Sequence, residues 1–176
     1  RISADTEGEG RILVLDSETL EIVREFDVPM DPSDMVVTDS GIVVATSGSG
    51  QWTAVRSFHV QTGNQLGSAS VYYHGRMALH PSQRIFYVST TAVNPSSFGR
   101  FDLDPATGVI TAGATSALGA GDLFPAPNGT EIVSATGALI SASENGVQDL
   151  QFLRQIVEAH FTDMFFDTSA GLTFGV

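Results

Sequence analysis

Four short stretches of the sequence place a charged residue before apolar residues. Asp34, Arg76, Asp122 and Asp163 hold the second position of SDMVV, GRMAL, GDLFP and TDMFF. Carboxylates brought together raise one another's pKa unless a cation or an arginine neutralises them. Ca²⁺ takes several oxygen ligands, so we predict it as the guest of Asp34, Asp122 and Asp163. Alternatively, each Asp accepts hydrogen bonds from loop amides and caps a strand.

Aromatic and imidazole side chains lie close to these charged positions in the chain. Aromatic, imidazole and charged groups on loops of a rigid scaffold are typical of a pocket for a small molecule or a glycan. In the alternative interpretation the Trp packs between repeats, and the two His are partly exposed loop residues. The predicted ligand-binding set comprises Trp52, Tyr73, His74, Arg76 and His160.

The four stretches mark an internal repeat with intervals of 42, 46 and 41 residues. This spacing is typical of repeats built from four short strands. A turn-forming segment and a short apolar run follow each marker, which indicates a β-hairpin. The sequence therefore predicts inner hairpins at 34–46, 76–90, 122–136 and 163–176.

A second family of hairpins alternates with the first. The segments LDSETLEIV, HVQTGNQL and LDPATGVIT each centre on a turn Thr, and a fourth copy is degraded. Asp16 and Asp104 precede their turn Thr by three residues, a spacing at which the carboxylate can accept turn amides. These outer hairpins are predicted at 11–28, 54–71, 98–113 and 138–156.

Eight alternating hairpins with no long helical pattern predict an all-β chain with radial repetition. A β-propeller of four-stranded antiparallel blades explains the period best, with 1–176 as one unit. The segments FDLDPATGVIT and ALHPSQRIFYVST resemble the YVTN-type and lactonase-type family of propellers. That family has about seven blades, whereas this chain supplies about four. It is therefore either a partial arc, expected to self-associate or pair with the remaining blades, or a closed four-bladed ring.

The resemblance also implies one enzymatic alternative, a lactonase-like hydrolase or isomerase acting on a small sugar acid. In that case His160 or His74 would act as general base, Arg76 would hold the anionic substrate and Asp163 would orient the base. The sequence contains no nucleophile elbow, glycine-rich phosphate loop, HExxH or EF-hand motif. We therefore expect a binding or interaction scaffold without catalytic residues and with no cofactor beyond Ca²⁺, and keep purely structural blades as a further alternative.

Charge and composition limit the partners of this chain. Its formal net charge is −12, with no Lys and no Cys among 176 residues. Such a surface repels nucleic acid, and no apolar run is long enough for membrane insertion. Together with the family resemblance, this favours a secreted, periplasmic or cell-surface location in a bacterium.

Overall fold

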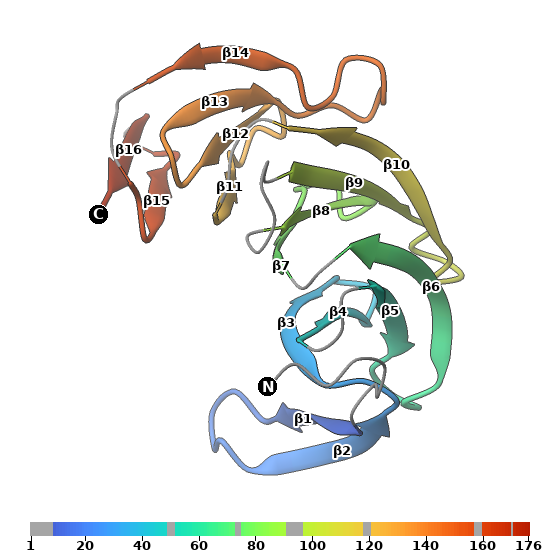
Figure 1. Ribbon diagram of the computed structural model, residues 1–176. Coiled ribbons are helices and arrows are strands. Elements are labelled where there is room, and N and C mark those ends of the chain that lie inside the picture. Colours follow the sequence, from blue (N-terminus) through green and yellow to red (C-terminus); the bar gives the residue numbers. More distant parts are fainter. Residues whose placement is uncertain are drawn as a thin grey trace, which may run out of the picture.

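The computed structural model describes residues 9–48, 52–72, 75–90, 97–117, 121–156, 160–169 and 171–176. Within these ranges the regular structure consists of β-strands, which confirms the predicted all-β class (Figure 1). The same ranges contain no helix long and apolar enough to cross a membrane. The strands are β1 (Gly10–Leu15), β2 (Ile22–Val28), β3 (Pro32–Val37), β4 (Ile42–Ser47), β5 (Trp52–His59), β6 (Gln65–Tyr72), β7 (Gly75–Leu79), β8 (Ile85–Thr90), β9 (Ser97–Leu103), β10 (Ile110–Ser116), β11 (Leu123–Pro125), β12 (Glu131–Ser134), β13 (Ala138–Ser141), β14 (Phe152–Gln155), β15 (Met164–Asp167) and β16 (Leu172–Gly175).

The strands form three complete sheets flanked by two isolated hairpins. Sheet 1 (β3 to β6), sheet 2 (β7 to β10) and sheet 3 (β11 to β14) each have four antiparallel strands in chain order. The N-terminal hairpin (β1 and β2) precedes them and the C-terminal hairpin (β15 and β16) follows them. Each complete sheet therefore joins an inner hairpin to the outer hairpin that comes next in the chain.

The second strand of sheets 1 and 2 is buried on both faces, which explains its continuous apolar sequence. In β4 Ile42 and Val44 pack with sheet 2, whereas Val43 and Ala45 pack with the N-terminal hairpin. The segment IFYVST of β8 divides its side chains in the same way between sheets 1 and 3. Successive side chains of a strand point to opposite faces, so one apolar strand contributes to two cores.

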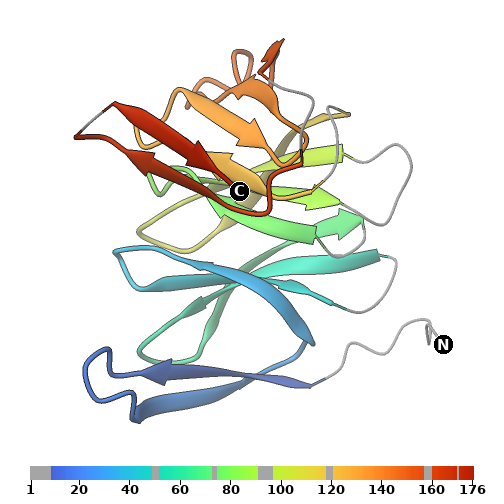
Figure 2. The ribbon, with the colours of Figure 1, turned by 90° about the vertical axis from the view of Figure 1, so that its left-hand side faces the viewer.

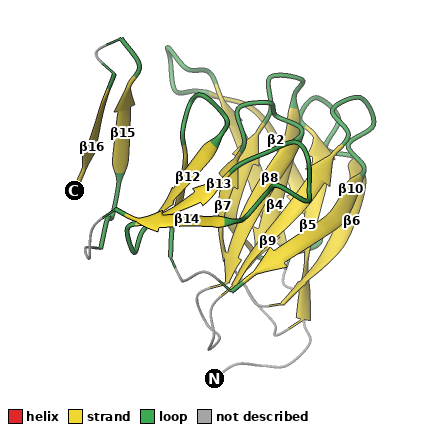
Figure 3. Cartoon of the chain, turned by 90° about the horizontal axis from the view of Figure 1, so that it is seen from above, coloured by secondary structure: helices red, strands yellow, loops and turns green. Residues whose placement is uncertain are grey.

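Three apolar cores hold successive sheets together. One joins the N-terminal hairpin to sheet 1, a second joins sheets 1 and 2, and a third joins sheets 2 and 3. The sheets stack face to face in an open arc, with the two flanking hairpins at its opposite ends (Figures 1 and 2). The closed four-bladed ring that the sequence allowed is therefore not formed. Figure 3 shows the C-terminal hairpin standing apart from sheet 3.

Carboxylates fix the tight turns of the outer hairpins, as their spacing predicts. The Asp104 carboxylate accepts the Ala106 amide at 2.9 Å and the Thr107 hydroxyl at 2.8 Å. These hydrogen bonds, led by that from the Ala106 amide, lower the pKa of the Asp104 carboxyl group. Asp16 accepts the amide of Thr19 at 2.8 Å in the corresponding turn. The prediction that these side chains accept turn amides is therefore confirmed.

Candidate functional site

The first of the four repeated charged residues links two neighbouring sheets. Asp34, in β3, accepts the amide of Met35 through Oδ1 at 2.9 Å. Its Oδ2 accepts the amide of Met77, in β7, at 2.7 Å. Because Met77 opens the next inner hairpin, this carboxylate fixes the spacing between sheets 1 and 2.

The remaining three charged residues make related contacts. Arg76 Nε lies 3.3 Å from Oδ1 of Asp122, which directly precedes the first strand of sheet 3. This ion pair is partly exposed, so it contributes at most about 1 kcal/mol to stability. Asp163 is exposed and accepts the amide of Met164 at 2.8 Å.

These contacts do not form the predicted calcium site. No group of three His, Asp or Glu in the described part of the chain is arranged to hold a metal ion. Asp34, Asp122 and Asp163 stand at the starts of three inner strands that fan apart along the arc, and Arg76 already pairs with the middle one. The amide contacts of Asp34 and Asp163 are those of the strand-capping alternative. Calcium binding stays a prediction that this geometry does not support.

The predicted ligand-binding residues are not brought together either. Trp52 is 72% exposed, and the edge of its ring meets Tyr72, with ring centroids 4.6 Å apart. His160 is exposed and makes no hydrogen bond or ion pair with any described residue. Tyr73 and His74 lie outside the described residues. No described acid or base stands beside His160, so the orienting role predicted for Asp163 has no counterpart here.

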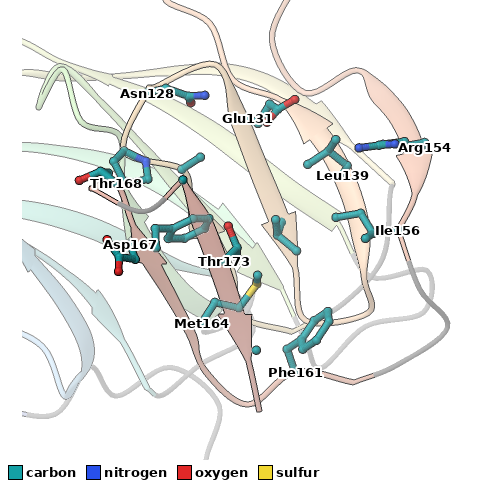
Figure 4. Close-up of a pocket in the computed structure, with 16 residues that line it drawn as sticks. Asn128, Glu131, Leu139, Arg154, Ile156, Phe161, Met164, Asp167, Thr168 and Thr173 are labelled. Carbon is teal, nitrogen blue, oxygen red and sulfur yellow. The ribbon is translucent and has the colours of Figure 1, made fainter.

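The largest feature around the C-terminal hairpin is a cleft that the sequence did not reveal. It has a volume of about 520 Å³ and separates sheet 3 from the C-terminal hairpin (Figure 4). Leu139, Arg154 and Ile156 line one wall, and Met164 and Thr173 line the other. Every earlier boundary between sheets is filled by an apolar core, so the cleft lies where a fourth core would be expected.

The rim of the cleft carries polar groups of both signs. The Glu131, Arg154 and Asp167 side chains border it, together with Asn128 and Thr168. Arg154 is exposed, and its guanidinium has no hydrogen bond or ion pair with any described residue. None of the predicted site residues lines the cleft. Sequence could not find it, because apolar residues that border a gap have the same pattern as residues that fill a core.

A buried polar cluster joins sheet 2 to the segment between β13 and β14. Arg100 and Asp149 have side chains 5% and 0% exposed, and Arg100 Nη1 donates to Asp149 Oδ2 at 2.8 Å. The Tyr87 hydroxyl donates to Asp149 Oδ1 at 3.1 Å.

Burial and charge both act on this cluster. Burial, reinforced by the Asp149 carboxylate, raises the pKa of the Tyr87 phenol. Burial lowers the pKa of Arg100, but hydrogen bonds to Asp102 and Asp149 outweigh it and the net shift is upward. The cluster therefore stays ionised at neutral pH and acts as a fastener between sheets. An Arg at an inward position of β9 was the only sequence signal for it.

Comparisons with known proteins show the fold alone. No known family model and no curated protein matches the chain. Among solved structures, a functionally unknown protein from Desulfotomaculum acetoxidans DSM 771 matches over 100% of the chain with a TM-score of 0.70 and 13% identity. Kuenenia stuttgartiensis hydrazine synthase matches over 89% (TM-score 0.64, 14% identity), and Saccharomyces cerevisiae Sqt1 over 78% (0.53, 16%). The matches cover 61%, 46% and 42% of those three chains.

Proposed function

We propose that the chain is an open arc of a β-propeller that serves as a non-enzymatic interaction scaffold in an exported or surface-associated bacterial protein. Radial repetition of four-stranded antiparallel sheets supports the propeller interpretation. The likeness to the D. acetoxidans protein, more than a third of which lies outside the match, supports an arc of a larger assembly. Propellers host many functions, so the argument for a scaffold rests on the surfaces at the two ends of the arc.

The observation that carries the proposal is that the arc ends in two different half-sheets. The N-terminal hairpin corresponds to the outer half of a sheet, and the C-terminal hairpin corresponds to the inner half. Among the described residues β1 pairs only with β2, and β16 pairs only with β15. Each end therefore presents an unpaired strand edge, which is a template for another strand.

The same half-sheets expose apolar side chains. Phe165 and Phe174 are 65% and 54% exposed, and they pair across β15 and β16 with ring centroids 6.5 Å apart. Leu13 and Val23 of the N-terminal hairpin are also exposed. Apolar faces beside unpaired strand edges mark surfaces that another polypeptide covers. The lactonase alternative has no comparable support, since His160 has no described partner.

A double substitution on the C-terminal face tests the scaffold. We expect the chain to associate as its concentration rises, and Phe165→Glu/Phe174→Glu to weaken association at least about tenfold. The reason is that burial of one large apolar side chain contributes about 1.5–3 kcal/mol. Sedimentation velocity over a concentration series measures this.

Val147→Glu is the matched control. Val147 is 84% exposed, but it lies in the connection between β13 and β14, away from both half-sheets. Association should persist in this variant. A parent chain that stays monomeric at every concentration would contradict the proposal.

A further inference from the structure

We infer that the partner of each half-sheet is a second copy of this chain, docked head to tail. The C-terminal hairpin of one copy joins the N-terminal hairpin of the other, and β16 pairs antiparallel with β1. This inference rests on the proposed propeller scaffold and names its partner. The product is one composite sheet with the order β15-β16-β1-β2.

The first support is the topology of the complete sheets. In sheets 1, 2 and 3 the second strand pairs antiparallel with the third, as β4 with β5, β8 with β9 and β12 with β13. Here β16 is a second strand without a third, and β1 is a third strand without a second. A second copy supplies the missing half at each end, in the connectivity that the chain already uses three times.

The second support is an apolar face on β3 that remains uncovered. Met35 and Val37 are 52% and 53% exposed, whereas Val36 between them packs toward sheet 2. Met35 and Val37 therefore point away from sheet 2, to the side on which the N-terminal hairpin covers only the outer half of sheet 1. The inner half of a preceding sheet would cover them. In the composite sheet, the C-terminal hairpin of the second copy takes that place.

The exposed rings of the C-terminal hairpin are on the face that this packing requires. Met164 and Thr173 face the cleft toward sheet 3, and Phe165 and Phe174 alternate with them along the strands. Phe165 and Phe174 thus point away from sheet 3, toward the next position of the arc. Docking brings them against Met35 and Val37 of the other copy, which buries four exposed apolar side chains.

The third support is charge complementarity on the opposite face of the composite sheet. Leu13, Glu25 and Asp27 share the face of the N-terminal hairpin that points away from sheet 1, since Ile12 and Val28 occupy the buried face. Docking turns this acidic face toward the outer half of sheet 3 in the other copy. The unpaired guanidinium of Arg154 lies there.

Two such junctions join two copies into a closed ring. Each copy contributes three complete sheets, and the two composite sheets bring the total to eight. Eight blades lie within the four to eight that are typical of propellers. A closed two-copy ring also agrees with the closed symmetry of most homo-oligomers. An unclosed head-to-tail series would instead grow into filaments.

Cross-linking between single-cysteine variants tests the junction, and the absence of Cys from the chain makes it specific. Leu13→Cys and Thr173→Cys are prepared separately and treated with a short bis-maleimide, each alone and as an equimolar mixture. A covalent dimer is expected only in the mixture. Covalent dimers from either variant alone would overturn the head-to-tail arrangement, as would their absence from a mixture that sediments as an associated species.

Size and charge reversal complete the test. The parent should sediment at twice 18.6 kDa, and larger open series would overturn the closed ring. Arg154→Glu should weaken association at least about tenfold, while Arg84→Glu, an exposed arginine in the β7–β8 turn, should leave it unchanged. Equal effects of the two substitutions would overturn the predicted charge contact. Failure of the scaffold itself is distinct, because the parent would then stay monomeric.

Discussion

At the scale of single residues, the cluster of Arg100, Asp149 and Tyr87 is the strongest polar contact between neighbouring sheets. Its side chains come from β9, β8 and the segment before β14, so one cluster fixes three parts of the chain. The ion pair is buried, and removal of one partner leaves the other charge without compensation.

Asp149→Ala tests this fastener. We expect a loss of about 3–5 kcal/mol in the free energy of unfolding, because Arg100 would remain buried and unpaired. Chemical denaturation at neutral pH measures the loss. The double variant Arg100→Met/Asp149→Leu is the control and should lose less than Asp149→Ala. A single variant as stable as the parent would show that the cluster does not hold the sheets together.

Residue spacing predicted local contacts but not contacts between sheets. The bonds of Asp16 and Asp104 to their own turns followed from a distance of two or three residues in the chain. The bond from Asp34 to the Met77 amide and the pairing of Arg100 with Asp149 join residues more than 40 positions apart. No local pattern carries that information, because it depends on how neighbouring sheets stack.

At the scale of elements, close approach of outer strands sets the angle between sheets 1 and 2. Gly67 in β6 lies against the turn before β10, and a Cβ on Gly67 would come within 2.7 Å of the Gly108 carbonyl oxygen. Ser57 also donates to that carbonyl. A side chain at position 67 would therefore push the two outer hairpins apart.

Gly67→Ala should destabilise the protein by about 1–3 kcal/mol, the usual effect of overpacking. Thermal unfolding measures the change. Gly146→Ala is the matched control, since a Cβ there meets no atom within 4 Å, and it should be neutral or slightly stabilising. Equal melting temperatures for the two variants would contradict the close packing of β6 on β10.

Hairpins were the most predictable elements of this chain. The apolar runs in β4 and β8 are bounded by turn residues, and Gly41 has a φ of 78°. These local signals indicate a hairpin whatever packs on it. The cleft beside the C-terminal hairpin was not predictable, because Met164 and Phe166 have the alternation of any half-buried strand. Whether a neighbouring sheet covers them is not a property of the strand.

At the scale of the whole molecule, the repeat period determined the number of sheets but not whether they close into a ring. Four inner and four outer hairpins are compatible with a closed ring or an arc, and the structure is an open arc. The offset between the ends, an outer half at one and an inner half at the other, makes the arc self-complementary. Completion of both half-sheets by a second copy is the central proposal.

Hydrogen–deuterium exchange at increasing chain concentration tests this proposal most directly. Strand pairing protects the amides that it engages. We predict that protection of residues 10–15 and 172–175 rises with concentration, while the outer edge strand β6 exchanges at a constant rate. Unchanged exchange of β1 and β16 at concentrations where the chain associates would contradict pairing between these strands.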